Sequence, residues 1–171
     1  MGRGFLLSVA VALGTTLTAC GGGGGSGTSS SATRSPSPTA DATTAYRRVL
    51  SQGNDLLNSD VDGYLSDCNL GIAPYKDSCR QWALMDEALV TQFVGLLSNA
   101  QVPAADASDD QLLRQGLQML VADDTAAGNA IGSGNEAAAT RALGKRLTDH
   151  CTAVSPVLSK LDPGVHGPPG C

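Results

Sequence analysis

The stretch WALMDEALVTQFVGLLSNA (residues 82–100) decides the fold that this chain of 171 residues is expected to adopt. Its apolar side chains recur at spacings of three and four, the period of an α-helix. We therefore predict a helix from about Pro74 to about Ala100, where Pro103 prevents its continuation. The apolar stripe covers more than half of the circumference, so this helix should be the most buried element. The stripe consists of Trp82, Met85, Leu89, Phe93 and Leu96, widened by Leu84, Val90, Val94 and Leu97.

Helical spacing also appears on either side of this stretch. A preceding helix should begin near Asp41, a good N-cap residue, and end between Ser59 and Asp67. A following helix should open at the capping-box pair Ser108 and Gln111. The residues expected to face inward are Tyr46, Val49, Leu50, Gly53, Leu56, Leu57, Val61 and Tyr64 in the preceding helix, and Leu113, Leu117, Leu120, Val121 and Ile131 in the following one.

The last helical stretch follows Asn135, whose side chain can cap a helix. Pro156 interrupts this stretch, because proline lacks an N–H and its ring clashes with the carbonyl of Thr152. We therefore expect Pro156 to kink the helix, or Ser155 to cap a short new one. The inward residues are Leu143, Leu147, Val154, Leu158 and Leu161.

Strand signals are missing from the sequence, since no segment alternates apolar and polar residues for long and aromatic residues are scarce. Short connections between the four helical stretches favour antiparallel neighbours. We predict an all-α fold, a four-helix up-and-down bundle over residues 40–171 that carries two disulfides.

The first twenty residues carry a targeting signal. Arg3 precedes an apolar run from Phe5 to Leu13, which is too short to span a bilayer because a spanning helix needs about 20 apolar residues. The tetrapeptide Leu17-Thr18-Ala19-Cys20 resembles a bacterial lipobox. The resemblance implies that residues 1–19 are a lipoprotein signal peptide and that Cys20 receives a lipid anchor, with palmitate among the acyl chains. A plain secretory signal cut after Ala19 and an uncleaved membrane helix are the alternatives.

The lipobox resemblance implies a lipoprotein of the cell membrane that faces outside the cytoplasm. Residues 20–39 would then be the lipidated cysteine and a flexible linker, since Gly, Ser, Thr and Pro bury too little apolar surface to fold. A linker of this length reaches about 25 Å as a random coil.

The charge of the chain argues against nucleic acid as a partner. Of eleven Lys and Arg, one lies in the predicted signal peptide, which leaves ten against sixteen Asp and Glu. A phosphate-binding face needs clustered basic residues, and Arg47-Arg48 is typical of a solvated helix face instead.

Four cysteines remain once Cys20 is assigned to lipid. In an oxidising compartment they predict two disulfides, with three connectivities possible. We expect the two sequence-nearest pairs, Cys68 with Cys79 and Cys151 with Cys171, because each closes a short loop. A metal site is the alternative, although no CxxC pair is present.

Residues 58–69 resemble an EF-hand calcium loop. Oxygen ligands fall at the expected places and Gly63 allows the sharp turn, but Asn69 stands where the family needs a bidentate Glu. Any calcium site should therefore be weak; otherwise the stretch is a helix end with solvated acidic residues. The candidate metal ligands are Asn58, Asp60, Asp62, Tyr64 through its carbonyl, and Ser66.

Other signatures of chemistry are weak. His150 and His166 would approach each other if Cys151 pairs with Cys171, which allows a transition-metal or haem contact, but surface histidines are the commoner outcome. No HExxH or GxSxG motif occurs in the domain, and no catalytic residue can be named.

The sequence thus favours a non-enzymatic, lipid-anchored extracytoplasmic helical protein that binds or scaffolds a partner at the cell envelope. The partner would be the membrane, through the anchor, together with an unknown protein or a small apolar ligand. A carrier of small ligands is the alternative, and it requires a cavity beside small residues. The residues that would line such a cavity are Gly53, Gly95, Gly116 and Gly144.

Overall fold

The computed structural model describes residues 38–59, 68, 71–165 and 171. The chain divides into two compact units, Met1–Thr33 and Arg34–Cys171, and the described residues all belong to the second. They form helices and turns, with no strand among them. The elements are α1 (Pro38–Asn58), α3 (Lys76–Ser98), the 3-10 turn η2 (Ala104–Asp106), α4 (Ala107–Gly132), α5 (Glu136–Asp149), the π-helical turn η3 (His150–Val154) and α6 (Ser155–Leu161). The prediction of an all-α fold with four helices is confirmed, if α5, η3 and α6 are taken as one interrupted helix.

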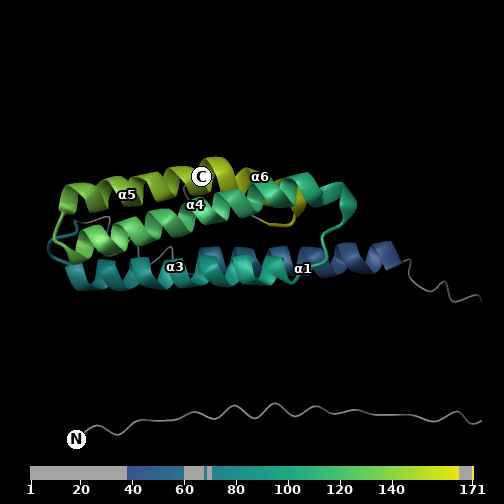
Figure 1. Cartoon of the computed structure of the whole chain (residues 1–171), viewed down its shortest axis with the longest axis horizontal. Helices are drawn as coiled ribbons and strands as arrows, with labels where there is room; N and C mark the ends of the chain where they lie inside the picture. Colours follow the sequence, from purple (N-terminus) through teal and green to yellow (C-terminus); the bar gives the residue numbers. More distant parts are fainter. Residues whose placement is uncertain (1–37, 60–67, 69–70, 166–170) are drawn as a thin grey trace, which may run out of the picture. The chain divides into compact units, whose positions relative to one another are not determined.

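Helices that follow one another along the chain pack side by side (Figure 1). Helices α3 and α4 are antiparallel, because Arg114 near the start of α4 bonds the Leu97 carbonyl, whereas Gly132 at the end of α4 lies beside Arg80. The interrupted helix returns along α4 in the same way. Lys145 reaches Asp123, and Lys160 reaches Asp109 close to the other end of α4.

Two apolar clusters fill the interior. The larger one joins α1 to the second half of α3, the first half of α4, η3 and α6. The smaller one joins the connection before α3 to the first part of α3, the last part of α4 and α5. Buried members of the larger cluster are Tyr46, Leu50, Leu57, Val90, Phe93, Leu97, Leu113, Leu117, Leu120, Val154, Leu158, Leu161 and Val165. Those of the smaller cluster are Cys68, Ile72, Cys79, Trp82, Ala83, Ala127, Ile131, Ala139 and Leu143.

The buried face of α3 differs from the predicted stripe. Met85 is 48% exposed and Leu84 is exposed as well, while Asp86 occupies the buried position beside them. The prediction that Met85 and Leu84 face inward is therefore wrong, as is the same prediction for Leu147 in α5. In α3 the helix is rotated so that a charged residue faces the core, which is possible only because that charge has a buried partner.

Helix starts were predicted with mixed success. Helix α1 begins at Pro38, before the predicted cap Asp41, since the fixed φ of proline suits a first turn. Helix α4 begins after η2, so Ser108 lies inside the helix and the predicted capping box is wrong. The Asn135 cap is confirmed, because its side-chain oxygen accepts a hydrogen bond of 3.1 Å from the Ala138 N–H.

The interruption predicted at Pro156 is present, and it takes the form of a π-helical turn. The N–H of Ser155 bonds the carbonyl of His150, five residues back, and Pro156 then occupies the first turn of α6. The wider turn removes the need for an N–H at Pro156 and keeps Val154 and Leu158 in the core.

A polar network ties α1 and α3 to the start of α4. The Tyr46 hydroxyl donates to Asp110 Oδ1 at 2.8 Å, and Arg114 Nε donates to Asp110 Oδ2 at 2.6 Å. Arg114 also donates at 2.7 Å to the Leu97 carbonyl near the end of α3, which accepts the Ala100 N–H at 3.0 Å as well. Burial and the Asp110 hydrogen bond raise the pKa of the Tyr46 phenol, which stays neutral and able to donate.

The glycines expected to line a cavity divide into two kinds. A Cβ on Gly53 would overlap the Phe93 ring, and one on Gly116 would crowd Val154 and the Ala153 backbone. Gly95 and Gly144 instead face open space. These four residues therefore do not line a common cavity: two permit close packing and two are exposed.

We predict that Gly53→Ala lowers the free energy of unfolding by about 1–3 kcal/mol, because the new methyl forces the Phe93 ring out of a filled site. The matched change Gly95→Ala should raise it by about 0.5–1 kcal/mol, since alanine is the better helix former and its methyl meets nothing. Urea unfolding of the full chain in detergent measures both. Equal effects of the two substitutions would contradict the packing described for Gly53.

Candidate functional site

Charged and titratable side chains from four helical elements meet in the interior. Asp86 of α3, Asp124 of α4, Arg146 of α5 and His150 of η3 have exposed fractions of 1%, 0%, 7% and 2%. We call these four residues the charged layer, and Asp86 with Asp124 the acid pair. Asp, Arg and His side chains are seldom this buried unless they are paired, so the layer is the feature of this bundle that apolar packing does not explain.

Arg146 is the cation of the layer. Its guanidinium pairs with Asp86 Oδ2 through one terminal nitrogen, and its Nε lies 3.2 Å from Asp124 Oδ1. The guanidinium carbon also stands 5.4 Å from the centroid of the Trp82 ring, at cation–π distance. One side chain of α5 thus contacts α3 twice and α4 once.

These contacts leave the carboxylates under-satisfied. All four oxygens of the acid pair are buried without a hydrogen bond of regular geometry, and Arg146 Nε is in the same position. The ion pairs are close enough for strong Coulomb attraction but are not aligned as directed hydrogen bonds. Buried polar atoms in this state are uncommon in native structures and call for a physical explanation.

Burial sets the proton affinities of the layer. It raises the pKa of Asp124 to about 9, with the charge of Asp86 adding to the rise and Arg146 opposing it. Burial also raises the pKa of Asp86, and the Arg146 charge works against that rise. Burial and the neighbouring Arg146 lower the pKa of His150 to about 4, so this imidazole is neutral at pH 7.

A second set of charges lies outside the layer, between α4 and α5, where Asp123 and Asp149 are largely buried and Lys145 is exposed. Lys145 Nζ is 3.0 Å from Asp123 Oδ1 and 2.5 Å from Asp149 Oδ2. Hydrogen bonds to these two carboxylates raise the pKa of Lys145, and burial raises the pKa of Asp123 against the opposing effect of Lys145. This triad is partly solvated, so it stabilises the fold less than its distances suggest.

The geometry restricts what the charged layer can do. A substrate cannot reach the acid pair in this conformation, because both carboxylates are closed off from solvent. No group of three His, Cys, Asp or Glu side chains in the described ranges is placed to hold a metal ion. Protons remain as the chemical species that the layer can exchange, since they need no open cleft.

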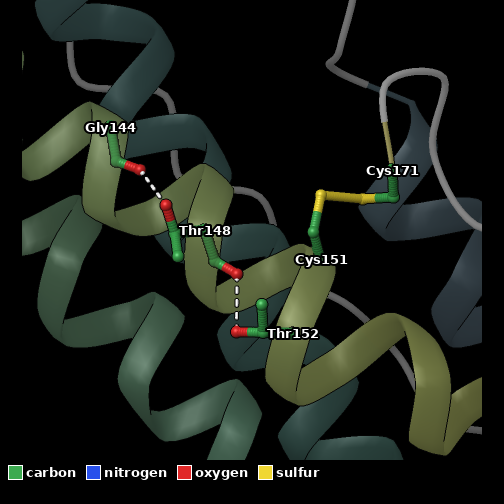
Figure 2. The surroundings of a disulfide bond; sticks show 5 residues. All are labelled: Gly144, Thr148, Cys151, Thr152 and Cys171. Carbon is green, nitrogen blue, oxygen red and sulfur yellow. Dashed lines mark hydrogen bonds between the residues drawn. A yellow bond between two sulfur atoms is a disulfide. The ribbon is translucent and has the colours of Figure 1, made fainter.

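The two predicted cysteine pairs lie at disulfide distance. Cα atoms are 5.3 Å apart in the pair Cys68–Cys79 and 5.1 Å apart in Cys151–Cys171. Cys79 is fully buried, whereas Cys171 is exposed. Figure 2 shows Cys151 beside Thr148 and Thr152, whose hydroxyls donate back to carbonyls four residues earlier. The second disulfide therefore connects the π-helical turn η3, in which Cys151 follows His150, to the exposed Cys171.

The remaining predicted ligands are only partly visible. Asn58 is the last residue of α1, and its Oδ1 is buried without a hydrogen-bond partner among the described residues. Asp60, Asp62, Tyr64 and Ser66 lie outside the described residues, as do Cys20 and His166. His150 is buried in the charged layer rather than exposed beside the tail.

A small pocket lies at the end of the bundle near the start of α5. Its volume of about 40 Å³ holds roughly one or two waters, far less than the several hundred Å³ typical of ligand sites. The lining residues are Ile72, Ala73, Lys76, Ile131, Gly134 and Glu136. No described helix is both long and apolar enough to cross a bilayer.

No family model, no curated protein and no solved structure matches this chain.

The charged layer was missed at the level of sequence, although a signal was present. Asp86 follows the buried Trp82 by four residues and precedes the buried Val90 by four. Asp124 follows the buried Leu120 by four residues, and Arg146 follows the buried Leu143 by three. Each charge thus occupies the inward register of its helix. Two acids and one base in three inward stripes would have predicted a buried ionic layer.

We predict that Arg146→Met lowers the free energy of unfolding by about 3–5 kcal/mol, because it leaves the acid pair buried without its cation. Arg141→Met, at an exposed site of the same helix, should change it by no more than about 0.5 kcal/mol. Chemical unfolding of both variants at pH 7 makes the comparison. Indistinguishable stabilities would mean that Arg146 does not neutralise the layer.

Proposed function

We propose that this protein is a lipid-anchored extracytoplasmic module of the bacterial cell envelope, which binds or scaffolds a protein partner at the membrane surface. The observation that supports it most directly is the coexistence of a lipobox-like Leu17-Thr18-Ala19-Cys20 with two cysteine pairs at disulfide distance. Disulfides persist in the oxidising space outside the cytoplasm, which is where a lipobox would place the domain.

The packing favours an interaction module over a carrier of small ligands. Gly53 and Gly116, two of the positions where a carrier would leave a gap, are filled by Phe93 and Val154. The pocket near Ile72 is too small for an apolar ligand. A partner would therefore meet the outside of the bundle, where large apolar side chains are exposed on α3, α4 and α5 and just before α3: Tyr75, Leu84, Met85, Leu112, Met119 and Leu147.

The antiparallel contacts of α3, α4 and the interrupted helix support an up-and-down bundle. The linker predicted for residues 20–39 would carry this bundle, and its last two residues belong to α1, which begins at Pro38. Such a linker would separate the domain from the lipid headgroups by about 25 Å without fixing its orientation. Native mass spectrometry of the protein from its host distinguishes the roles: a co-purified protein supports a scaffold, whereas a bound lipid or haem would support the carrier.

We predict that labelled palmitate enters the protein and that Cys20→Ala abolishes both the label and membrane retention, because no other residue offers the lipidated thiol. The measurement is fractionation of labelled cells into membrane and medium. Cys171→Ala with Cys151→Ala is the matched control: it removes two cysteines and should leave the label in place. Normal release of the unmodified protein into the medium would refute the anchor.

Weak calcium binding at residues 58–69 is the second candidate. The observation in its favour is Asn58 Oδ1, which occupies the first ligand position and is buried without a hydrogen-bond donor among the described residues. The stretch has two carboxylates, Asp60 and Asp62, and no bidentate Glu at its last position, so a dissociation constant of about 10⁻⁴ to 10⁻³ M is expected.

We predict that 1 mM calcium raises the free energy of unfolding by about 1.4 kcal/mol if the dissociation constant is about 10⁻⁴ M, which amounts to a few degrees in Tm. Asp60→Asn combined with Asp62→Asn should remove this increment, and Asp55→Asn, on the exposed side of α1, should retain it. Thermal melts with and without calcium decide. A melting curve that 5 mM calcium leaves unmoved would mean that the stretch is an acidic helix end.

A further inference from the structure

We propose that Asp86 and Asp124 share one bound proton, so that the charged layer is a proton-binding site that links the packing of α3, α4 and α5 to the pH outside the cell. The proton binding rests on the interior of the bundle alone, whereas the identification of the relevant pH as the one outside the cell rests on the proposed function.

The first argument is the charge balance of the site. Asp86 and Asp124 would contribute two negative charges when ionised, and Arg146 contributes one positive charge. His150 follows Arg146 by four residues, and burial and the Arg146 charge lower its pKa and keep it neutral. Of the other nearby charges, Asp123, Lys145 and Asp149 pair among themselves between α4 and α5. One proton on the acid pair makes the buried layer neutral, which removes most of the cost of desolvating it.

The second argument is hydrogen bonding. Two ionised carboxylates are acceptors only, so neither can satisfy the other. The carboxylates of Asp86 and Asp124 nevertheless lie against the same guanidinium, and their four oxygens lack regular partners. A proton converts one carboxyl into an O–H donor, and the ionised carboxylate of the other accepts it. One proton on the acid pair therefore explains both why its oxygens lack donors and why the layer has one positive charge too few.

The shape of the site supports a proton rather than a larger cation. Asp86 and Asp124 are closed off from solvent, and the Arg146 guanidinium already lies against both carboxylates. The Trp82 ring stacks at 5.4 Å from that guanidinium. A metal ion would have to displace the arginine, whereas a proton requires no additional volume.

The direction of the pH dependence follows from the raised and lowered pKa values. Asp124, with a pKa of about 9 in the fold and 3.8 as its ordinary value, binds a proton on folding between these limits, so stability falls as pH rises across that range. His150, with a pKa of about 4 in the fold against 6.5, has the opposite effect between pH 4 and 6.5. The two effects offset each other below pH 6.5, and the effect of the acid pair remains above it.

The test uses the full chain in detergent. Between pH 6.5 and 9 the equilibrium constant for unfolding should rise by up to about tenfold per pH unit, the limit for one linked proton. Asp124→Asn should flatten this dependence, because the amide keeps the donor but cannot lose it. Asp123→Asn, one residue away in the separate triad with Lys145, should leave a clear rise of the unfolding constant with pH. A wild-type unfolding constant that stays flat or falls over this range would overturn the proposal.

Infrared spectroscopy of the wild-type protein provides a readout that survives if a variant fails to fold. At pH 7 a carbonyl band of one buried protonated carboxyl should be present, should shift in D₂O, and should disappear in Asp86→Asn as well as in Asp124→Asn. Loss of the band in both variants supports sharing between the two residues. Absence of the band in the wild type, or its persistence in both variants, would show that the pair does not hold the proton.

Discussion

The arrangement of this bundle depends on the contact of one guanidinium with two buried carboxylates on different helices. Arg146 of α5 reaches Asp86 on α3 and Asp124 on α4. A slide of any of these helices by one turn, about 5.4 Å, would leave a charge buried alone, at a cost of several kcal/mol. Apolar packing tolerates such slides far better, because one leucine replaces another. The charged layer therefore fixes the axial register of α3, α4 and α5 relative to one another.

The layer also explains why the apolar interior is divided in two. The larger cluster ends at Val90, Leu120 and Val154, and the smaller one begins at Trp82, Ala127 and Leu143, with the charged residues between them. Each apolar cluster is also held by its own interaction between distant parts of the chain. Cys68–Cys79 lies in the smaller cluster, and the hydrogen bonds of Tyr46 and Arg114 to Asp110 close the larger one.

The sequence predicted the helices and cysteine pairs more successfully than the interior chemistry. Periodicity located Phe93, Leu117 and Leu158 correctly, because large apolar residues at three- and four-residue spacing have few other places to go. Periodicity failed at Met85 and Leu147, because it places apolar residues inward and polar residues outward. In the structure Asp86 and His150 occupy buried positions, and Met85 and Leu147 are exposed. Partners such as Arg146 and Asp124 are contributed by distant segments, so their pairing depends on the tertiary structure.

The π-helical turn between α5 and α6 has a consequence for how the length of this chain can vary. A π turn contains one residue more than an α turn, so it absorbs a residue that in a plain helix would rotate everything after it by about 100°. If His150–Val154 wound as a plain helix with the same number of residues, Leu158 and Leu161 would leave the core together. A chain that lacks one residue of this turn would instead form a plain helix and keep both leucines inward, so a one-residue gap at this place would mark the loss of the π turn.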